Sequence, residues 1–312
     1  MEPASVMNKP ILVVGSINMD LVMRTPHVPA SGETMYGEQL RAIPGGKGAN
    51  QAVAAARLGR PVIMAGRVGR DHFGETLLDN LAADGVDTAH IERDETEASG
   101  TTFIFVEPNG ANTIVVATGA NGRFSPGSAE RLAGLLDRVE LVLLQLELPL
   151  DSMGRVIELA RAAGKPVVLD AGPACRQPLP AFFQVTVLSP NEAETEALTG
   201  MAIPDRDSAL RAARLLLSKG PESVVLKLGA KGALLASREK TLFLPAHAVR
   251  PVDTTAAGDA FSAALAVSLA EGRELEEAVH VANAAGALAV TKEGAQPSMP
   301  THRELEAFLR AS

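Results

Sequence analysis

Uninterrupted apolar runs alternate along the chain with longer stretches in which apolar residues recur at helical spacing. The first run, 11–15, is apolar and ends in glycine, which predicts a buried parallel strand. Further strands are predicted over 141–145, 166–170, 185–188 and 223–228, with a hairpin-like stretch that continues to Leu244. Helices are predicted over 49–58, 73–83, 152–163, 207–218, 260–270, 275–290 and 303–310, and another begins near Arg131.

This alternation of strand and helix predicts an α/β fold with a doubly wound, mainly parallel central sheet that is flanked by helices. Ligands of such sheets bind beyond the carboxyl ends of the strands. Six polar or glycine residues follow predicted strands closely: Asn18, Asp20, Glu147, Asp170, Asn191 and Gly229. The sequence therefore predicts a binding site at this edge of the sheet, although we do not include Asp170 among the predicted catalytic residues.

Two segments depart from this pattern and predict a small second sheet. Residues 18–41 mix proline, glycine and alternating residues, and two alternating runs between 101 and 117 flank Pro108, Asn109 and Gly110, a strong hairpin signal. We expect segments at about 18–43 and 98–118 to form a projecting β-sheet lid. Residues 1–10 lack a hydrophobic stretch and are expected to be a disordered leader, so that 11–312 form a single α/β domain with this lid.

Composition restricts the partners and the location of the protein. With 29 Lys and Arg residues against 37 Asp and Glu residues, the net charge is −8, which argues against a nucleic-acid or anionic-membrane surface. No apolar run approaches membrane-spanning length. A single cysteine, Cys175, excludes an internal disulfide and a multi-cysteine metal site. We expect a cytoplasmic protein with small-molecule substrates and without nucleic-acid or membrane partners.

The segment 252–259, VDTTAAGD, precedes an apolar, alanine-rich run. Its small residues, ending in Gly258, leave backbone N–H groups free where a helix should begin, and such a helix N-terminus attracts anions. Asp259 would then stand beside a phosphate bound to the turn, where a carboxylate can act as the base in phosphoryl transfer. A structural alternative is that Asp259 only caps a buried helix.

A second glycine-rich segment, 44–51, has the sequence PGGKGANQ and also runs into an alanine-rich helix. Its glycines permit close backbone approach, Lys47 adds a positive charge and Asn50 projects an amide from the first helical turn. Because Lys47 is followed by Gly48, the P-loop pattern is absent, and no G-x-G-x-x-G follows a strand. Taken alone, this loop is either a ligand site or a turn with a tight helix entry.

The two glycine motifs, their order and their spacing resemble those of the ribokinase family of carbohydrate kinases, and the likeness extends from Gly15 to Ser298. The resemblance implies a ribokinase-like fold and phosphorylation of D-ribose at its 5-hydroxyl by ATP. It implies Asp259 as the general base and an anion hole formed by Ala256, Ala257 and Gly258. Many members carry glycine where Ala256 stands, but alanine keeps the N–H group. The family commonly pairs two lids, which implies a homodimer.

Further contacts are implied by the same resemblance. The sugar would be bound by Asn18, Asp20, Gly46, Lys47, Asn50, Glu147 and Asp259. The nucleotide would be bound by Asn191, Glu194, Lys227, Gly229, Gly232, Gly258 and Asn283. Lys227 departs from the family, in which a small hydroxyl residue is common. Structural alternatives are a turn-forming role for Asn18 and Asp20, a solvent-exposed Glu147 and a buried amide at Asn283.

The resemblance also implies two metal ions. Asn191 and Glu194 share one helical face, and Glu194 would act through water on phosphate-bound Mg²⁺, which keeps several of its waters. A monovalent cation such as K⁺ would be held, mostly through backbone carbonyls, by Asp253, Thr255, Ala289, Lys292, Gly294 and Ser298. Both features have structural alternatives, namely an acidic first helical turn and a tight turn rich in glycine and proline.

Other functions stay open. The nearest alternative is a kinase of the same fold that acts on 2-deoxyribose, another sugar or a nucleoside, although Asn18 and Asp20 favour ribose. A sugar-binding protein that has lost catalysis belongs to a different class. Such a protein would be expected to lose Asp259 or the anion hole, and this chain has both.

Overall fold

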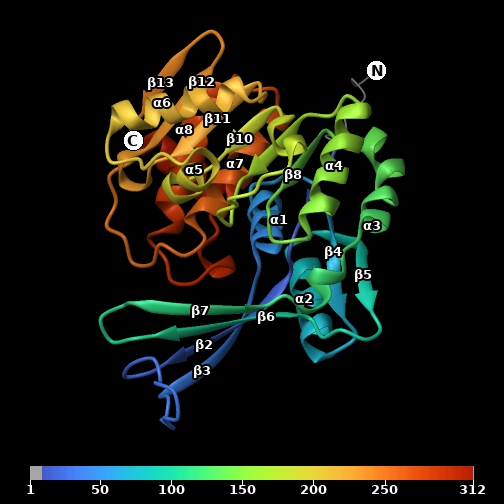
Figure 1. The fold of residues 1–312 in the computed structure, drawn as a ribbon, viewed down its shortest axis with the longest axis vertical. Coiled ribbons are helices and arrows are strands. Elements are labelled where there is room, and N and C mark those ends of the chain that lie inside the picture. Colours follow the sequence, from blue (N-terminus) through green and yellow to red (C-terminus); the bar gives the residue numbers. More distant parts are fainter. Residues whose placement is uncertain (1–8, 312) are drawn as a thin grey trace.

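A computed structural model describes residues 9–311 of the chain. The disordered leader expected over residues 1–10 lies almost wholly outside these described residues. Within them, a large body is built around one sheet, and a smaller sheet projects from its lower side in Figure 1.

The body's sheet has nine strands in the order β13-β12-β11-β10-β9-β8-β1-β4-β5. These strands are β1 (Ile11–Val14), β4 (Val62–Gly69), β5 (Asp87–Asp94), β8 (Leu141–Leu144), β9 (Val167–Asp170), β10 (Val187–Ser189), β11 (Ser223–Lys227), β12 (Ala233–Ser237) and β13 (Thr241–Leu244). Neighbouring strands are parallel except at β12, which runs antiparallel to both β11 and β13. The mainly parallel sheet predicted from the apolar runs is confirmed.

Helices cover both faces of this sheet because successive side chains of a strand point to opposite sides. Ile11 and Val13 of β1 belong to one hydrophobic core, and Leu12 and Val14 belong to the other. The first core is covered by α1 (Lys47–Arg57), α2 (His72–Ala83), α7 (Ala257–Ala270), α8 (Leu275–Ala289) and α9 (His302–Ala311). The second is covered by α3 (Pro126–Glu130), α4 (Leu150–Ala162), α5 (Glu192–Thr199) and α6 (Arg206–Ser218). None of the described helices is long and apolar enough to cross a bilayer.

The smaller sheet, which we call the lid, has the strand order β3-β2-β6-β7. It contains β2 (Asn18–Arg24), β3 (Gln39–Gly45), β6 (Gly100–Val106) and β7 (Asn112–Ala117). β2 is antiparallel to β3 and parallel to β6, so two segments that are distant in the sequence lie side by side. Asp20, Thr102 and Val116 are register partners on the face turned toward the body. This arrangement confirms the expected small projecting sheet.

The sequence prediction lacks β4 and β5 and is wrong about one helix. β4 interrupts its apolar run with Gly66 and Arg67, and β5 is a largely polar edge strand. Neither has the continuous apolar character of a strand buried on both faces. No α-helix begins near Arg131: α3 ends before it, and Ala133–Arg138 form a 3₁₀ helix. Gly134 weakens a continuous α-helix at this point.

The start of α1 lies directly against the end of β1. A Cβ atom added at Gly48 would lie 2.5 Å from the carbonyl carbon of Gly15 and 2.6 Å from its Cα atom. Only glycine permits such an approach of two backbones. This contact places the first turn of α1 beyond the carboxyl end of β1, where the predicted binding residues gather.

Candidate active site

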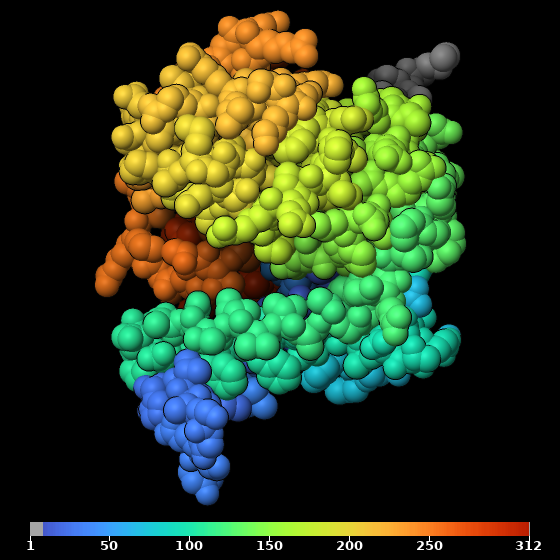
Figure 2. All heavy atoms as spheres, in the orientation of Figure 1, coloured from blue at the N-terminus to red at the C-terminus, as the bar shows by residue number. Residues whose placement is uncertain are grey.

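A cavity of about 710 Å³ lies between the carboxyl ends of the body's strands and the inner face of the lid. Figure 2 shows its opening as a hollow between the green β6–β7 hairpin and the orange and red part of the body. Most of the predicted site residues line this cavity: Asn18, Asp20, Gly46, Lys47, Asn50, Glu147, Asn191, Glu194, Lys227, Gly229, Thr255, Ala256, Gly258 and Asp259. The structure therefore brings the sugar-side and nucleotide-side candidates into one space.

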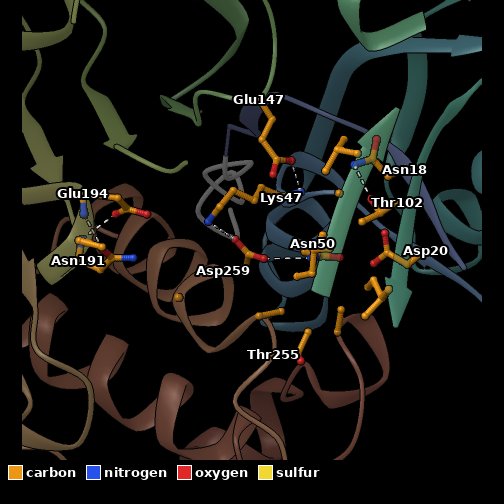
Figure 3. A pocket seen from close by; sticks show the side chains of 18 of the residues that line it. Asn18, Asp20, Lys47, Asn50, Thr102, Glu147, Asn191, Glu194, Thr255 and Asp259 are labelled. Atoms are coloured by element: carbon orange, nitrogen blue, oxygen red, sulfur yellow. Dashed lines mark hydrogen bonds and ion pairs between the residues drawn. The ribbon is translucent and has the colours of Figure 1, made fainter. Parts of the chain in front are cut away.

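Asp259 occupies the first turn of α7 at the centre of this cavity (Figure 3). Its Oδ2 atom accepts a hydrogen bond from the Asn50 amide at 3.0 Å. Its Oδ1 atom accepts from the Gln51 amide at 3.0 Å and from the Lys47 ammonium at 3.4 Å. Three donors from the start of α1 thus hold one carboxylate of α7, and the side chain of Asp259 is only 5% exposed.

The turn before α7 presents backbone N–H groups to the cavity. Ala256 has a φ of 58°, in the left-handed region, and no other described residue except glycine has a positive φ. The N–H of Asp259 donates to the carbonyl of Ala256 at 3.0 Å, whereas the N–H of Gly258 has no acceptor among the described residues. Backbone of this kind at a helix start forms a concave set of N–H groups that binds anions.

Glu147 lies at the N-terminus of α1. The N-cap residue there is Gly46, which has no side chain to accept a hydrogen bond from the first N–H groups of the helix. Its Oε2 atom accepts the backbone N–H of Lys47 at 3.1 Å and the hydroxyl of Ser16. A negative charge stabilises a helix at this end. The Oε1 atom makes no hydrogen bond to described residues, so Glu147 combines a structural contact with one oxygen available to a ligand.

Asn18 and Asp20 face the cavity from β2 of the lid. The Asn121 amide donates to Oδ1 of Asn18 at 2.7 Å, and Nδ2 of Asn18 donates to the Thr102 hydroxyl at 3.4 Å, which fixes the amide. Burial raises the pKa of the Asp20 carboxyl to about 6; the Thr102 hydroxyl lowers this pKa and the charge of Glu147 raises it. An amide and a carboxylate on one face suit the vicinal hydroxyls of a sugar.

Asn191 and Glu194 lie together, as their spacing predicts, but they also bind each other (Figure 3). The N–H of Glu194 donates to Oδ1 of Asn191 at 2.8 Å, and the N–H of Asn191 donates to Oε2 of Glu194 at 2.7 Å. This capping box fixes the start of α5. Burial raises the pKa of Glu194, whereas the nearby Lys227 ammonium lowers it. One oxygen of Glu194 remains for a ligand.

Among the residues predicted for the sugar, the nucleotide and the anion hole, three do not line the cavity: Gly232, Asn283 and Ala257. The Asn283 amide donates to the carbonyl oxygens of Pro245 at 3.3 Å and Leu244 at 3.5 Å. A Cβ at Gly232 would lie 2.0 Å from that same carbonyl oxygen of Leu244. Asn283 and Gly232 therefore contact the end of β13, and their predicted role in nucleotide binding stays a prediction.

Three of the six residues predicted to hold a monovalent cation come together from two segments. Oδ2 of Asp253 accepts the N–H of Gly294 at 2.9 Å, and Oδ1 accepts the N–H and hydroxyl of Thr255 at 2.9 and 2.7 Å. These three residues line a neighbouring cavity of about 510 Å³. The other three predicted residues, Ala289, Lys292 and Ser298, do not line it.

Two polar residues outside the predicted set contact the centre of the site. The Gln51 amide donates to Asp170 at 2.8 Å as well as to Asp259 at 3.0 Å. Asp170 ends β9 and its side chain is fully buried. Gln51 follows Asn50 in the glycine motif and Asp170 ends a strand, so each had a positional signal. No spacing in the sequence indicates that they touch.

The geometry combines a buried carboxylate, a helix start with a free N–H group and side chains suited to hydroxyl groups in one cavity. A carboxylate beside a bound phosphate can deprotonate an alcohol that attacks phosphorus. Together with the α/β body and its lid, this site defines a phosphotransferase of the sugar kinase class.

Comparison with known proteins agrees with this class. Residues 8–302 match the pfkB family of carbohydrate kinases. The ribokinase of Bacillus subtilis (strain 168) is 41% identical over 96% of this chain and 99% of its own length. The deoxyribokinase of Salmonella typhi is 37% identical over 96% of this chain and 98% of its own. A structure of Arabidopsis thaliana ribokinase complexed with ribose and ATP has a TM-score of 0.91 and 33% identity, covering 98% of this chain and 100% of that one.

The chain therefore belongs to the pfkB family of carbohydrate kinases, and it is a sugar kinase. The resemblance to the ribokinase family and the expected ribokinase-like fold are confirmed.

Proposed function

We propose that this chain phosphorylates D-ribose at its 5-hydroxyl with ATP, which gives D-ribose 5-phosphate and ADP. The observation that carries the proposal is the position of Asp259. Its carboxylate stands between the side chains of Lys47 and Asn50 and the anion-binding turn at Gly258. The hydroxyl-binding side chains of the lid open into the same cavity, and full-length similarity to a ribokinase supports the choice of sugar.

In the proposed mechanism, the Asp259 carboxylate removes the proton from the 5-hydroxyl as that oxygen attacks the γ-phosphorus of ATP. The bond between this phosphorus and the bridging oxygen breaks, and ADP leaves with the electron pair. The N–H groups of Ala256 and Gly258, which have no acceptor among the described residues, and the Lys47 ammonium stabilise the charge on the transferred group. Closure of the lid over the sugar excludes water and limits ATP hydrolysis.

Two cations belong to this proposal. The free oxygen of Glu194, which lies beside Asn191, would contact Mg²⁺ through the waters that this ion retains, and the ion would neutralise phosphate charge. Asp253 accepts hydrogen bonds from Thr255 and from Gly294, and it thereby joins two segments whose residues are proposed to supply ligands to a monovalent ion. Such an ion would order the segment from Asp253 to Asp259 and would align the turn before α7.

K⁺ is expected to activate the enzyme more than Na⁺ in a buffer that is otherwise free of monovalent metals. The reason is that the larger ion matches carbonyl ligands and orders the turn before α7. ADP should be quantified directly by chromatography, because the activity of a coupling enzyme could itself change with the monovalent cation. Equal rates in K⁺, Na⁺ and a bulky organic cation would rule out the cation role of Asp253, Thr255 and Ser298.

Ribose is expected to exceed 2-deoxyribose in kcat/KM by roughly ten- to a hundredfold, because a buried carboxylate that loses one of two hydroxyl donors loses about 1–3 kcal/mol. Asp20→Ala should remove most of this preference and leave ADP affinity unchanged, since Asp20 lies in the lid and the nucleotide residues lie in the body. ADP-release assays over pentoses, hexoses and nucleosides test this. Equal use of both sugars, or weakened ADP binding in Asp20→Ala, would show that the sugar pocket is misplaced.

Ribose affinity is expected to fall as the pH drops through about 6, the raised pKa of Asp20. Below this pH the carboxyl is protonated in most molecules and no longer accepts two hydroxyl donors. The KM for ribose should be about tenfold higher at pH 5 than at pH 8. Asp20→Asn is the matched control, because its KM should not change with pH in this window. The same pH profile in both proteins would assign the titration to another group.

Phosphorylation of 2-deoxyribose is the second candidate function, which the relative named deoxyribokinase supports. The ratio of kcat/KM for ribose to that for 2-deoxyribose decides between these two functions. The ADP-release assays over pentoses, hexoses and nucleosides also test other substrates. Absence of turnover with every sugar, together with retained sugar binding, would favour a non-catalytic sugar-binding protein.

We also propose a homodimer that forms through the lid. The lid face that points away from the cavity exposes Leu40, Phe103 and Val115. Exposed apolar patches of this kind mark protein interfaces.

The cytoplasmic location expected from the sequence remains a prediction.

A further inference from the structure

Asp170 is a buried carboxylate that the mechanism above does not use. It lies at the carboxyl end of β9, and its side chain has no exposed surface. Its Oδ1 atom accepts a hydrogen bond from the Lys227 ammonium at 2.5 Å. Its Oδ2 atom accepts from the Gln51 amide at 2.8 Å and from the Lys47 ammonium at 3.4 Å. One carboxylate therefore joins a lysine from each half of the cavity.

Lys227 brings its charge to the nucleotide side of the cavity. It ends β11, and its N–H donates to the carbonyl of Pro190 at 2.8 Å, which places it beside Asn191. Its Nζ atom would lie 3.8 Å from a Cβ added at Gly258, in the first turn of α7. The Lys227 side chain is only 11% exposed. This ammonium thus stands between Asp170 and the anion-binding turn.

Opposite charges around Asp170 shift the pKa values of Asp170 and of Lys47. Burial alone raises the pKa of Asp170, but the charges of Lys227 and Lys47 outweigh it and lower that pKa below its usual value. Burial alone lowers the pKa of Lys47, yet Asp170 and Asp259 raise it well above normal. An ammonium has three N–H donors. Lys227 can therefore keep its bond to Asp170 and donate to a phosphate oxygen at the same time.

We propose that Asp170 is a positioning residue that holds the ammonium groups of Lys47 and Lys227 in the cavity, and that Lys227 binds the phosphates of the nucleotide. The phosphates would lie between Lys227 and the N–H groups of the turn before α7. Lys47 would lie on the sugar side of the transferred group. Its Nζ atom is 3.4 Å from a carboxylate oxygen of Asp170 and 3.4 Å from one of Asp259. The roles of Lys47 and of the phosphates rest on the proposed function.

The first test compares the affinities for ADP and adenosine by calorimetry on the full chain, with Lys227→Met and Lys227→Arg. Charged hydrogen bonds to phosphate are strong, so Lys227→Met should weaken ADP about tenfold or more and leave adenosine within about twofold. Lys227→Arg should recover most of the loss. Lys240→Met is the matched control, because Lys240 forms an exposed ion pair with Glu276 outside the cavity. Unchanged ADP affinity, or equal losses for both ligands, would contradict the proposal.

The second test concerns Asp170. Asp170→Asn should lower kcat roughly tenfold or more, because small displacements of groups at a reacting centre are costly. ADP should bind this variant more tightly than it binds Lys227→Met, because the Lys227 ammonium is still present although no carboxylate holds it in place. A merely structural role would instead lower the melting temperature and leave kcat unchanged in the folded fraction. Unchanged turnover would therefore reject the positioning role.

The double variant Asp170→Asn with Lys227→Met separates function from stability. Replacement of a buried ion pair by neutral side chains often restores stability, so its melting temperature should exceed that of Lys227→Met. Its ADP affinity should stay as low as that of Lys227→Met, whereas recovery to the wild-type affinity would show that the pair is only structural. The ADP-binding test uses no sugar. A wild type that fails to phosphorylate ribose would therefore refute the proposed function and leave the test of Lys227 intact.

Discussion

Asp259→Asn is expected to lower the turnover of ATP and D-ribose by about a thousandfold or more while both substrates still bind. Loss of a general base costs roughly 10²–10⁴ in rate, and this carboxylate also orients the attacking hydroxyl. Asparagine keeps the size of the side chain and one oxygen that can accept from Asn50 or Gln51. The measurement is steady-state ADP release, combined with calorimetric binding of ribose and of ADP to the variant.

A suitable control is Asp151→Asn, which makes the same change in the first turn of another helix. Asp151 lies in α4, is exposed and does not line the cavity, so its turnover should equal that of the wild type. Near-normal turnover in Asp259→Asn would remove Asp259 from the mechanism. Loss of sugar and nucleotide binding would mean that the substitution disrupts the site and does not test the base.

Gly48→Ala is expected to lower the free energy of unfolding by about 3 kcal/mol, near the upper end for overpacked sites. The added Cβ would lie 2.5 to 2.7 Å from backbone atoms of Gly15 and Ser16, which cannot rotate away as a side chain could. In an open helix, replacing glycine by alanine stabilises the protein by about 1 kcal/mol. A decrease in the free energy of unfolding would therefore show that the close approach of Gly48 to the backbone of Gly15 matters. Urea denaturation followed by circular dichroism measures it.

Gly134→Ala is the matched control for Gly48→Ala. A Cβ at Gly134 would have no neighbour within 4 Å, and this glycine does not have a positive φ. The free energy of unfolding of Gly134→Ala should equal or slightly exceed that of the wild type. Equal stabilities of the wild type and Gly48→Ala would show that α1 can move away from β1 without cost. The folded fraction of Gly48→Ala should also turn over more slowly, because Lys47 and Asn50 lie in the same helical turn.

Local pattern predicted much of the fold and the position of the site. Apolar runs such as 11–15 are buried on both faces, and only a sheet covered by helices on both sides provides that environment. The glycine motifs mark helix starts at the carboxyl edge of this sheet, and both lie at the cavity. β4 and β5 escaped prediction because their burial depends on neighbouring strands and helices more than on their own composition.

The contacts within the site could not be predicted in the same way. Asn283 is among the residues predicted to bind the nucleotide, and its amide donates to the carbonyls of Leu244 at the end of β13 and of Pro245. Asn191 and Glu194 have the spacing of a joint cation site, yet they cap α5 together. A spacing specifies which side chains share a helical face. It does not specify which partner satisfies their polar atoms.

The sequence by itself determined the α/β class of this protein, the projecting sheet and the positions of the two glycine-rich helix starts, because periodicity and glycine act over a few neighbouring residues. Only the tertiary structure decided that Asp170 joins Lys47 to Lys227, and that Gln51 binds both Asp170 and Asp259. Gln51 and Asp259 are 208 residues apart. Contacts at such separations arise when packed strands and helices meet, and burial then requires each charged or polar group to find a partner.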